Sequence, residues 1–152
     1  MIKKILLILF ATFLLNNCEY KPIYSDLNNL NYKIIVTEFT GDKKLNKFII
    51  DNLKRNNQKK TNETIQIKID TQYTKTIAAK DTAGTITNYQ TNAITTFQIK
   101  KGEVSETFVV NEKFNFQKIS DKYEEKRYEE NIKRNLAASI SQKLILRLAV
   151  IK

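Results

Sequence analysis

The sequence contains no histidine and only one cysteine, Cys18, and both shortages limit the chemistry that the chain could carry out. Without histidine there is no Ser-His-Asp or Cys-His catalytic arrangement, and the commonest zinc ligand is missing. A single cysteine cannot form a disulfide within the chain. No cluster of carboxylates or lysines points to another kind of catalysis. We therefore expect no enzymatic activity, no metal ion and no cofactor.

The sequence also lacks an apolar run long enough to cross a membrane. Its longest uncharged apolar run, from Ile5 to Leu15, follows Lys3 and Lys4. A membrane-spanning helix needs roughly 20 apolar residues, and this run is clearly shorter. A short positive segment followed by a short apolar run is typical of a secretory signal peptide.

Cys18 follows this run in the sequence LLNNC, which resembles a bacterial lipobox. In such signals a peptidase cuts before the cysteine, and the thiol then receives diacylglycerol. Asn17 departs from the pattern, because most lipoboxes have Gly, Ala or Ser in that position. A lone cysteine is often a small buried residue, but a place directly after the signal favours a covalent lipid anchor. We therefore predict a signal peptide at 1–17, a lipidated tether at 18–31 and a single domain at 32–152.

The formal net charge of the chain is +10, and the chain stays strongly basic without Lys3 and Lys4. An exported basic protein meets phospholipid headgroups and lipopolysaccharide rather than nucleic acid, so we expect an anionic partner. Four cations cluster in the segment KRNNQKK, residues 54–60. This cluster has two interpretations: a solvated helix end that the helix dipole favours, or a contact for an anionic lipid or saccharide.

Hydrophobic periodicity predicts the element order β-α-β-β-β-α. Strands are expected at 32–39, 64–78, 85–100 and 104–119, where β-branched and aromatic residues alternate with polar ones. Helices are expected at 43–57 and 121–151, with Asp42 and either Ser120 or Asp121 as N-caps. These elements predict an α+β two-layer sandwich, with a four-stranded, mainly antiparallel sheet and two helices on one face.

Three surface features have an open interpretation. The strand at 85–100 is rich in threonine, and its polar face is either ordinary solvent exposure or a surface that hydrogen-bonds a partner. The carboxylates Glu124, Glu125, Glu129 and Glu130 are interpreted as a solvated helix face. The helix end at 144–151 is apolar nearly all round, so either the chain leaves the helix there as an extended tail or a partner covers it. Leu146 and Val150 are the candidate partner contacts.

The residues as a set resemble the LPS-assembly lipoprotein LptE family, in particular its alphaproteobacterial members. The resemblance starts at LLNNC and the following EYKPIY, continues through the predicted element order, and ends at the helix sequence YEENIKRNLAASISQKLILRLA. It spans essentially the whole chain after the signal. Glu19 follows the cysteine where an aspartate would signal retention in the inner membrane of enterobacteria, so the sequence is compatible with outer-membrane sorting.

The resemblance implies a lipid-anchored protein on the periplasmic side of the outer membrane of a Gram-negative bacterium. Its expected partners are an LptD-like β-barrel, which it would plug and help to assemble, and lipopolysaccharide. Candidate LPS contacts, chosen only for charge and placement, are Lys75, Lys80, Lys100 and Lys101. Two alternatives stay open: a stand-alone periplasmic lipoprotein that binds phospholipid or another amphiphile, and an assembly lipoprotein of a different envelope complex.

The lipid anchor can be tested by the substitution Cys18→Ser. We expect an unacylated, soluble periplasmic form, because serine does not provide the thiol that carries the lipid. Metabolic labelling with radioactive palmitate measures this directly. Equal labelling of the variant and the wild type would contradict the anchor.

Overall fold

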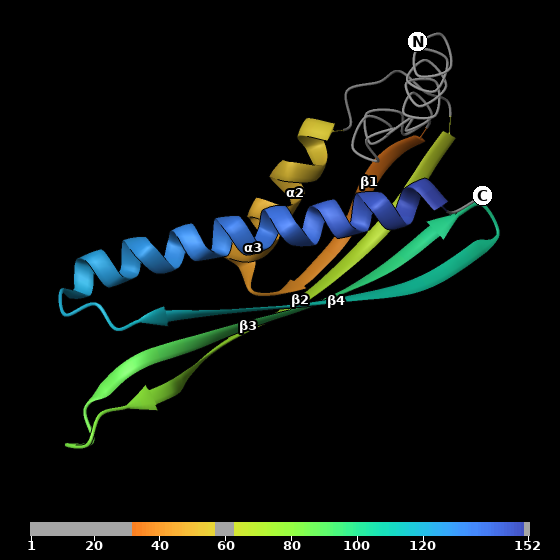
Figure 1. The fold of residues 1–152 in the computed structure, drawn as a ribbon. Coiled ribbons are helices and arrows are strands. Elements are labelled where there is room, and N and C mark those ends of the chain that lie inside the picture. Colours follow the sequence, from red (N-terminus) through yellow and green to blue (C-terminus); the bar gives the residue numbers. More distant parts are fainter. Residues whose placement is uncertain (1–31, 57–62, 151–152) are drawn as a thin grey trace, which may run out of the picture.

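The computed structural model describes residues 32–56 and 63–150, which form a two-layer sandwich of one sheet and two helices (Figure 1). Its elements are β1 (Tyr32–Gly41), α2 (Lys43–Asn56), β2 (Glu63–Lys80), β3 (Ile86–Lys101), β4 (Val104–Gln117) and α3 (Lys122–Val150). The predicted α+β class and element order are therefore confirmed. The predicted signal peptide, the tether and Cys18 lie outside the described residues.

The sheet is mixed and open, with the strand order β1-β2-β3-β4. β2 pairs antiparallel with β3, and β3 pairs antiparallel with β4. β1 pairs parallel with β2, because the chain passes through α2 between these two strands and re-enters the sheet in the same direction. The sheet is thus mainly antiparallel, as predicted, with one parallel pair at its edge.

The core lies between the sheet and the helices, and it follows from the two periodicities of the sequence. Alternate residues of β2 point to the helices, and Ile65, Ile67 and Ile69 are buried there. The same alternation places Phe97 of β3 in the core, fully buried. The helices contribute residues at three- and four-residue spacing, which are Leu45, Ile49 and Leu53 from α2 and Ile132, Leu136, Ile140, Leu144 and Leu148 from α3. Burial of each side chain of this size stabilises the folded state by about 1.5–3 kcal/mol relative to leaving it exposed.

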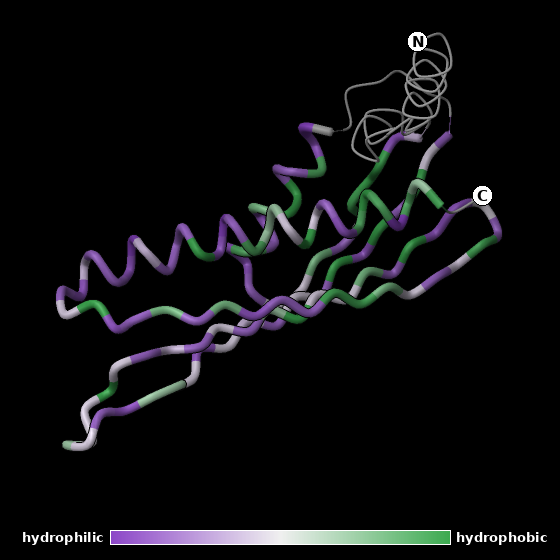
Figure 2. The backbone as a smooth tube through the Cα atoms, viewed as in Figure 1, coloured by the Kyte–Doolittle hydropathy of each residue, from purple (hydrophilic) through white to green (hydrophobic). Residues whose placement is uncertain are grey.

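Hydrophobic residues are not evenly distributed along the sandwich (Figure 2). They concentrate where α2 and the C-terminal half of α3 lie over the sheet, whereas the N-terminal half of α3 is mostly polar. Where the N-terminal half of α3 lies over the sheet, the contacts between helix and sheet are largely ionic. The sandwich thus has an apolar core at one end and a polar interface between its two layers at the other.

Asp42 connects three elements at the start of α2. Its backbone N–H donates to the carbonyl of Thr71 in β2 at 2.8 Å, and its Oδ1 accepts from the N–H of Leu45 at 2.8 Å. The second carboxylate oxygen accepts from Lys133 of α3 at 2.6 Å. Burial alone would raise the pKa of Asp42, but the hydrogen bond from Lys133 and the backbone donors lower it below its ordinary value. The predicted cap therefore also anchors α3.

A ladder of polar contacts joins the last half of α3 to β4. Glu112 accepts hydrogen bonds from Ser139 at 2.7 Å and pairs with Lys143 at 2.7 Å. Burial would raise the pKa of Glu112, yet these partners hold it below its usual value. One turn later, the guanidinium of Arg147 pairs with Glu106. The four-residue spacing of Ser139, Lys143 and Arg147 places all three over β4.

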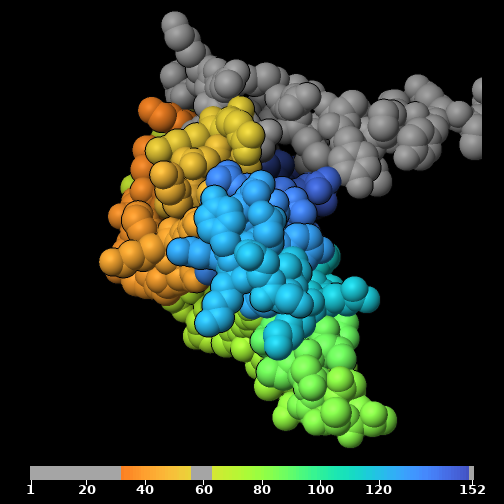
Figure 3. All heavy atoms as spheres, turned by 90° about the vertical axis from the view of Figure 1, so that its left-hand side faces the viewer, coloured from red at the N-terminus to blue at the C-terminus, as the bar shows by residue number. Residues whose placement is uncertain are grey.

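The hairpin of β2 and β3 extends beyond the helix layer as an arm (Figure 3). β1 pairs with β2 only as far as Thr71, so the second half of β2 has one unpaired edge within the described chain. Asp81 closes the hairpin, because its side chain accepts from the N–H groups of Ala83 and Thr85. None of the described helices has the length and apolar character needed to cross a membrane.

Gly41 provides a test of this fold at the turn from β1 into α2. Its φ is +86°, and a Cβ there would lie 2.0 Å from the carbonyl oxygen of Thr71. We expect Gly41→Ala to reduce the free energy of unfolding by about 3 kcal/mol or more, because the backbone must move.

Gly84→Ala is the matched control for this substitution. Gly84 has a similar φ of +81°, but a Cβ there meets no atom within 4 Å. The control should cost only the backbone strain of about 1–2 kcal/mol. Urea denaturation of both variants measures the difference, and equal costs would show that the close approach at Gly41 is unimportant.

Candidate partner-binding surface

The face of the sheet that points away from the helices is not covered by any described part of the chain (Figure 1). On β3 the residues facing the helices are buried, so the alternate residues face outward. From Asn88 to Gln98 these outward residues are uncharged, and they comprise Asn88, Gln90, Asn92, Ile94, Thr96 and Gln98. Lys100 follows on the same side at the end of the strand. The middle of β3 therefore presents mainly amide side chains on its outward face.

The neighbouring strands extend this face. Gln90 lies opposite Asn115 of β4, and its amide donates to the Asn115 carbonyl oxygen at 2.9 Å. Ile94 lies between Gln72 of β2 and Asn111 of β4. Amide side chains both donate and accept hydrogen bonds. We call this surface, formed by the outward residues of β2, β3 and β4, the amide face.

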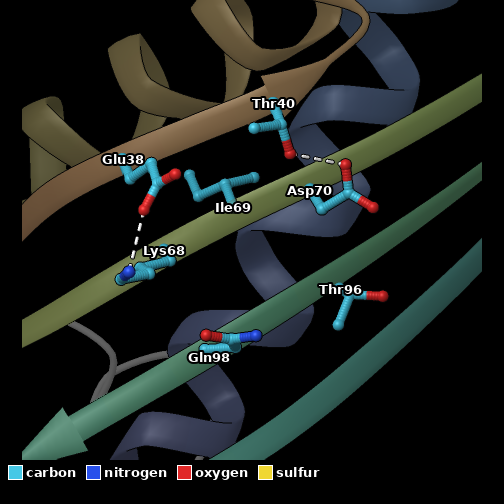
Figure 4. Close-up of a pocket in the computed structure, with 7 residues that line it drawn as sticks. All are labelled: Glu38, Thr40, Lys68, Ile69, Asp70, Thr96 and Gln98. Carbon is cyan, nitrogen blue, oxygen red and sulfur yellow. Dashed lines mark hydrogen bonds and ion pairs between the residues drawn. The ribbon is translucent and has the colours of Figure 1, made fainter.

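A hollow of about 210 Å³ lies at the end of the amide face where β1 joins the sheet (Figure 4). Two rows of side chains cross the strands there: Glu38, Lys68 and Gln98 form one row, and Thr40, Asp70 and Thr96 form the other. Lys68 pairs with Glu38 at 2.8 Å, and the hydroxyl of Thr40 donates to Asp70 at 2.6 Å. Both carboxylates therefore already have partners within the protein. The hollow can thus offer a ligand hydrogen-bonding groups rather than unpaired charges.

The charged groups of the hollow are two carboxylates and one lysine, and each of them contacts another side chain of the hollow. In the two described ranges, 32–56 and 63–150, no group of three or more acidic or cysteine side chains is placed to hold a metal ion. Hydrogen bonding to a polar partner is the chemistry that this surface supports.

The threonine-rich strand divides between the two faces. Thr91 and Thr95 point inward and are fully buried, whereas Thr96 lies on the amide face. The Thr95 hydroxyl lies 3.1 Å from that of Thr71, and Thr91 donates to the carbonyl of Phe114. Part of the polarity seen in the sequence therefore belongs to a hydrogen-bonded polar layer inside the sandwich.

The four lysines proposed as LPS contacts are not brought together. Lys80 lies at the exposed tip of the β2–β3 hairpin. Lys100 and Lys101 lie at the opposite end of β3, and only Lys100 is exposed. Lys101 is half-buried, 3.8 Å from Glu63 and 5.1 Å above the ring of Tyr32. The four residues therefore form no single cationic site, and their role as LPS contacts stays a prediction.

Lys75 points inward and joins the sheet to α3. Its ammonium pairs with Glu125 at 2.7 Å and with Glu129 at 3.3 Å, and it lies 4.3 Å from the centre of the Tyr89 ring. Burial alone would lower the pKa of Lys75, but the hydrogen bonds and charges of the two carboxylates raise it. The interpretation of Glu125 and Glu129 as solvated surface groups is therefore wrong, since both are half-buried partners of Lys75.

The partners of Lys75 could not be predicted from the sequence, because they depend on how α3 is positioned along the sheet. Glu129 precedes Lys133 by four residues and Glu130 precedes Arg134 by four, a spacing at which helix side chains can pair. The pair of Glu130 and Arg134 is present at 2.8 Å. Lys133 instead reaches Asp42, and its ammonium lies 4.0 Å from the Tyr73 ring. Only the position of α3 over the sheet decides which carboxylate faces which lysine.

The apolar end of α3 is mostly covered by the domain itself. Leu144, Ile145 and Leu148 are buried, and the hydroxyl of Tyr32 donates to the carbonyl of Leu148. The helix continues to Val150, so among the described residues no extended tail replaces it. Leu146 is half-buried and Val150 is 69% exposed. These two positions stay predicted partner contacts.

Solved structures of bacterial lipoproteins have a similar fold. The structure of rare lipoprotein B from Shewanella oneidensis matches 74% of this chain and 93% of that chain, with a TM-score of 0.57 and 11% identity. The structure of a minor lipoprotein from Acinetobacter baumannii matches 77% of this chain and 90% of its own, with a TM-score of 0.54 and 13% identity. The structure of the uncharacterized lipoprotein B from Nitrosomonas europaea matches 75% of this chain and 80% of its own, with a TM-score of 0.52 and 11% identity.

Comparison of the sequence alone gives no such likeness. No protein-family model matches the sequence, and no curated protein matches it. At identities this low, the structural likeness is one of fold. The sandwich of residues 32–56 and 63–150 is therefore the fold found in these bacterial lipoproteins.

The role of Lys75 can be tested against that of Lys80. Lys75→Met removes an ammonium held by two half-buried carboxylates, and we expect it to reduce the free energy of unfolding by about 1.5–3 kcal/mol at neutral pH. Lys80→Met is the matched control, because Lys80 is exposed, and should change stability by less than about 0.5 kcal/mol.

The pH dependence gives a second measurement of the same interaction. Since the pKa of Lys75 is raised on folding, its stabilising contribution is fully present below the unfolded value of about 10.5. It should be lost as the pH rises through the higher pKa of the folded state. Chemical denaturation at neutral and alkaline pH measures this, and a constant gap between wild type and Lys75→Met would contradict it.

Proposed function

We propose that the chain is a lipid-anchored outer-membrane lipoprotein that plugs and helps to assemble an LptD-like β-barrel, and that assists lipopolysaccharide delivery to the outer leaflet. The observation that carries this proposal is a lipoprotein-type sandwich located downstream of a lipobox-like cysteine. The sandwich has the fold of rare lipoprotein B and a minor lipoprotein. The cysteine and the EYKPIY segment provide the resemblance to the LptE family. On this proposal the protein acts by binding rather than catalysis.

The amide face supports the proposed contact with a barrel. The lumen of an outer-membrane barrel is lined by polar residues, and a plug must offer them hydrogen-bonding groups. The outward residues of β3 from Asn88 to Gln98 include amides and a hydroxyl, and none of them is charged. Neutral donors and acceptors are cheaper to remove from water than unpaired charges. A surface of this kind can therefore be enclosed by a polar partner.

A second candidate function rests on a different part of the molecule. A groove of about 430 Å³ runs beside β1, the edge strand of the described sheet, and is lined mainly by apolar side chains. Ile34, Ile35, Val36 and Phe39 line it from β1, and Ile50, Leu53 and Lys54 line it from α2. Such a groove could take an acyl chain, as a stand-alone lipoprotein that binds an amphiphile would require.

Co-purification distinguishes these functions. In mild detergent, a large barrel protein should accompany the wild-type chain, and its identity by mass spectrometry separates an LPS translocon from another envelope complex. A monomer carrying bound lipid, without a barrel, would support the second candidate and contradict the first.

The introduction of positive charge into the amide face tests the role of that face. We expect the double variant Thr96→Arg and Gln98→Arg to recover about ten-fold less barrel protein, because two large charged groups would have to lose their hydration in the contact. The control is Asn131→Arg with Asn135→Arg, which adds the same charge at exposed positions of α3. Equal recovery of the barrel protein with both variants would contradict a role for the amide face. The proposed function itself is tested separately, by recovery of the barrel with the wild-type chain.

A further inference from the structure

The positive charge of the described chain is concentrated in the helix layer. The two helices carry 12 basic and 5 acidic residues, whereas the four strands carry 7 basic and 5 acidic residues. The layers therefore differ in formal charge by five, with +7 on the helices and +2 on the strands. A chain whose positive charge served only solubility would not need to place it on one side. The helix layer is thus the face that an anionic surface would attract.

The lysines near the start of α2, unlike Lys54 in its last turn, are not explained by the stability of the helix. Its first turn contains Lys43 and Lys44 and no acidic residue, although the positive end of the helix dipole favours acidic side chains there. Lys44 pairs with Glu130 of α3, but Lys43 and Lys47 form no ion pair with any described residue. Cations at the unfavourable end of a helix, without carboxylate partners, indicate another purpose.

These lysines share one outward stripe of α2. At 3.6 residues per turn, Lys43, Lys47 and Lys54 fall within about 40° of one another around the helix axis. All three are exposed, while Leu45 and Ile49 bury the other side of the helix. The stripe therefore extends over three turns of the helix, which is longer than a single small anion could contact.

A groove of about 630 Å³ lies beside this stripe, between α2 and α3. Its lining includes Phe48, Asp51, Lys54 and Arg55 from α2 and Arg134 from α3. The guanidinium of Arg134 lies 4.2 Å from the centre of the Phe48 ring and pairs with Glu130 at 2.8 Å. The lining of the groove thus contains three cations and one carboxylate, that of Asp51.

The position of Arg134 suits the recognition of a phosphate. A guanidinium has five N–H donors in a fixed plane, and stacking on a ring with one carboxylate contact leaves several of them available. Phosphate oxygens accept two parallel hydrogen bonds from such a group. Phe48 adds an apolar ring beside the charge, as a lipid headgroup region would favour.

We infer that the helix layer docks on an anionic phospholipid bilayer, with the Lys43–Lys47–Lys54 stripe facing the surface and the α2–α3 groove holding a lipid phosphate. The length of the stripe favours a bilayer over a free phosphate ion, because separate lysines would contact separate headgroups. In this docked state the amide face points away from the bilayer, so docking and contact of that face with a barrel in the same membrane are alternative states of the protein. This inference does not depend on the identity of the barrel.

Vesicle binding of the full chain with Cys18→Ser tests the inference without a lipid anchor. The measured quantity is the ratio of the partition coefficient on mixed phosphatidylcholine and phosphatidylglycerol vesicles to that on phosphatidylcholine alone. This ratio removes any contribution from apolar segments. Replacing Lys43, Lys47 and Lys54 by Gln should reduce the ratio by about five-fold per lysine at low salt, on the order of 100-fold in total. Arg134→Gln should reduce it by about five-fold.

The matched control replaces Lys33, Lys68 and Lys113 by Gln, which removes the same charge from the strands. It should change the ratio several-fold less than the helix variant, with circular dichroism showing that both are folded. Equal losses would mean that only net charge matters and would overturn the inference. No preference for phosphatidylglycerol, with binding only to vesicles that contain lipopolysaccharide, would also overturn it. A barrel recovered or lost in the separate co-purification does not affect this result.

Discussion

In the described part of the chain, two helices cover one face of a four-stranded sheet, and the other properties of this protein follow from that constraint. The helices bury the inward residues of β2 and β3, with Ile67 and Phe97 at the centre. No described residue covers the opposite face, which is therefore available to water or a partner. Its uncharged amides cost less to remove from water than charged groups would. One-sided covering thus gives the molecule two chemically different surfaces.

The junction between the layers is polar in one half of the sandwich, and this polarity specifies how the helices lie on the sheet. Apolar packing tolerates small rotations of a helix, whereas an ion pair needs two particular side chains to meet. Lys75 of β2 pairs with Glu125 in that half, and Glu112 of β4 pairs with Lys143 nearer the C-terminal end of α3. Lys133 of α3 pairs with Asp42 at the start of α2. These contacts fix α3 in position above the strands. Lys75, which the sequence suggested as a ligand contact, is thereby already paired.

The two surfaces lead to two proposals. A face rich in amide groups suits a polar protein partner, and a cationic helix layer suits an anionic bilayer. A lipid anchor at Cys18 would hold the chain close to a membrane while leaving both surfaces to orient it. The apolar groove beside β1 is a third feature, lined in part by the exposed Ile35 and Phe39.

The sequence by itself determined the element order, the cap at Asp42 and most of the core, because each of these depends on neighbours within a few residues. It left Ser120 and Asp121 open as the cap of α3, and the structure shows that Asp121 accepts the hydrogen bond from the N–H of Glu124. It also limited the chemistry, since histidine is absent. Only the tertiary structure decided that Glu125 and Glu129 face Lys75, that half of the threonine-rich strand is buried, and that the candidate lysines lie far apart. These facts depend on register and on the placement of α3, where residues 50 or more positions apart meet. Local sequence patterns do not specify such contacts, because α3 could lie over the sheet in several positions that bury the same apolar stripe.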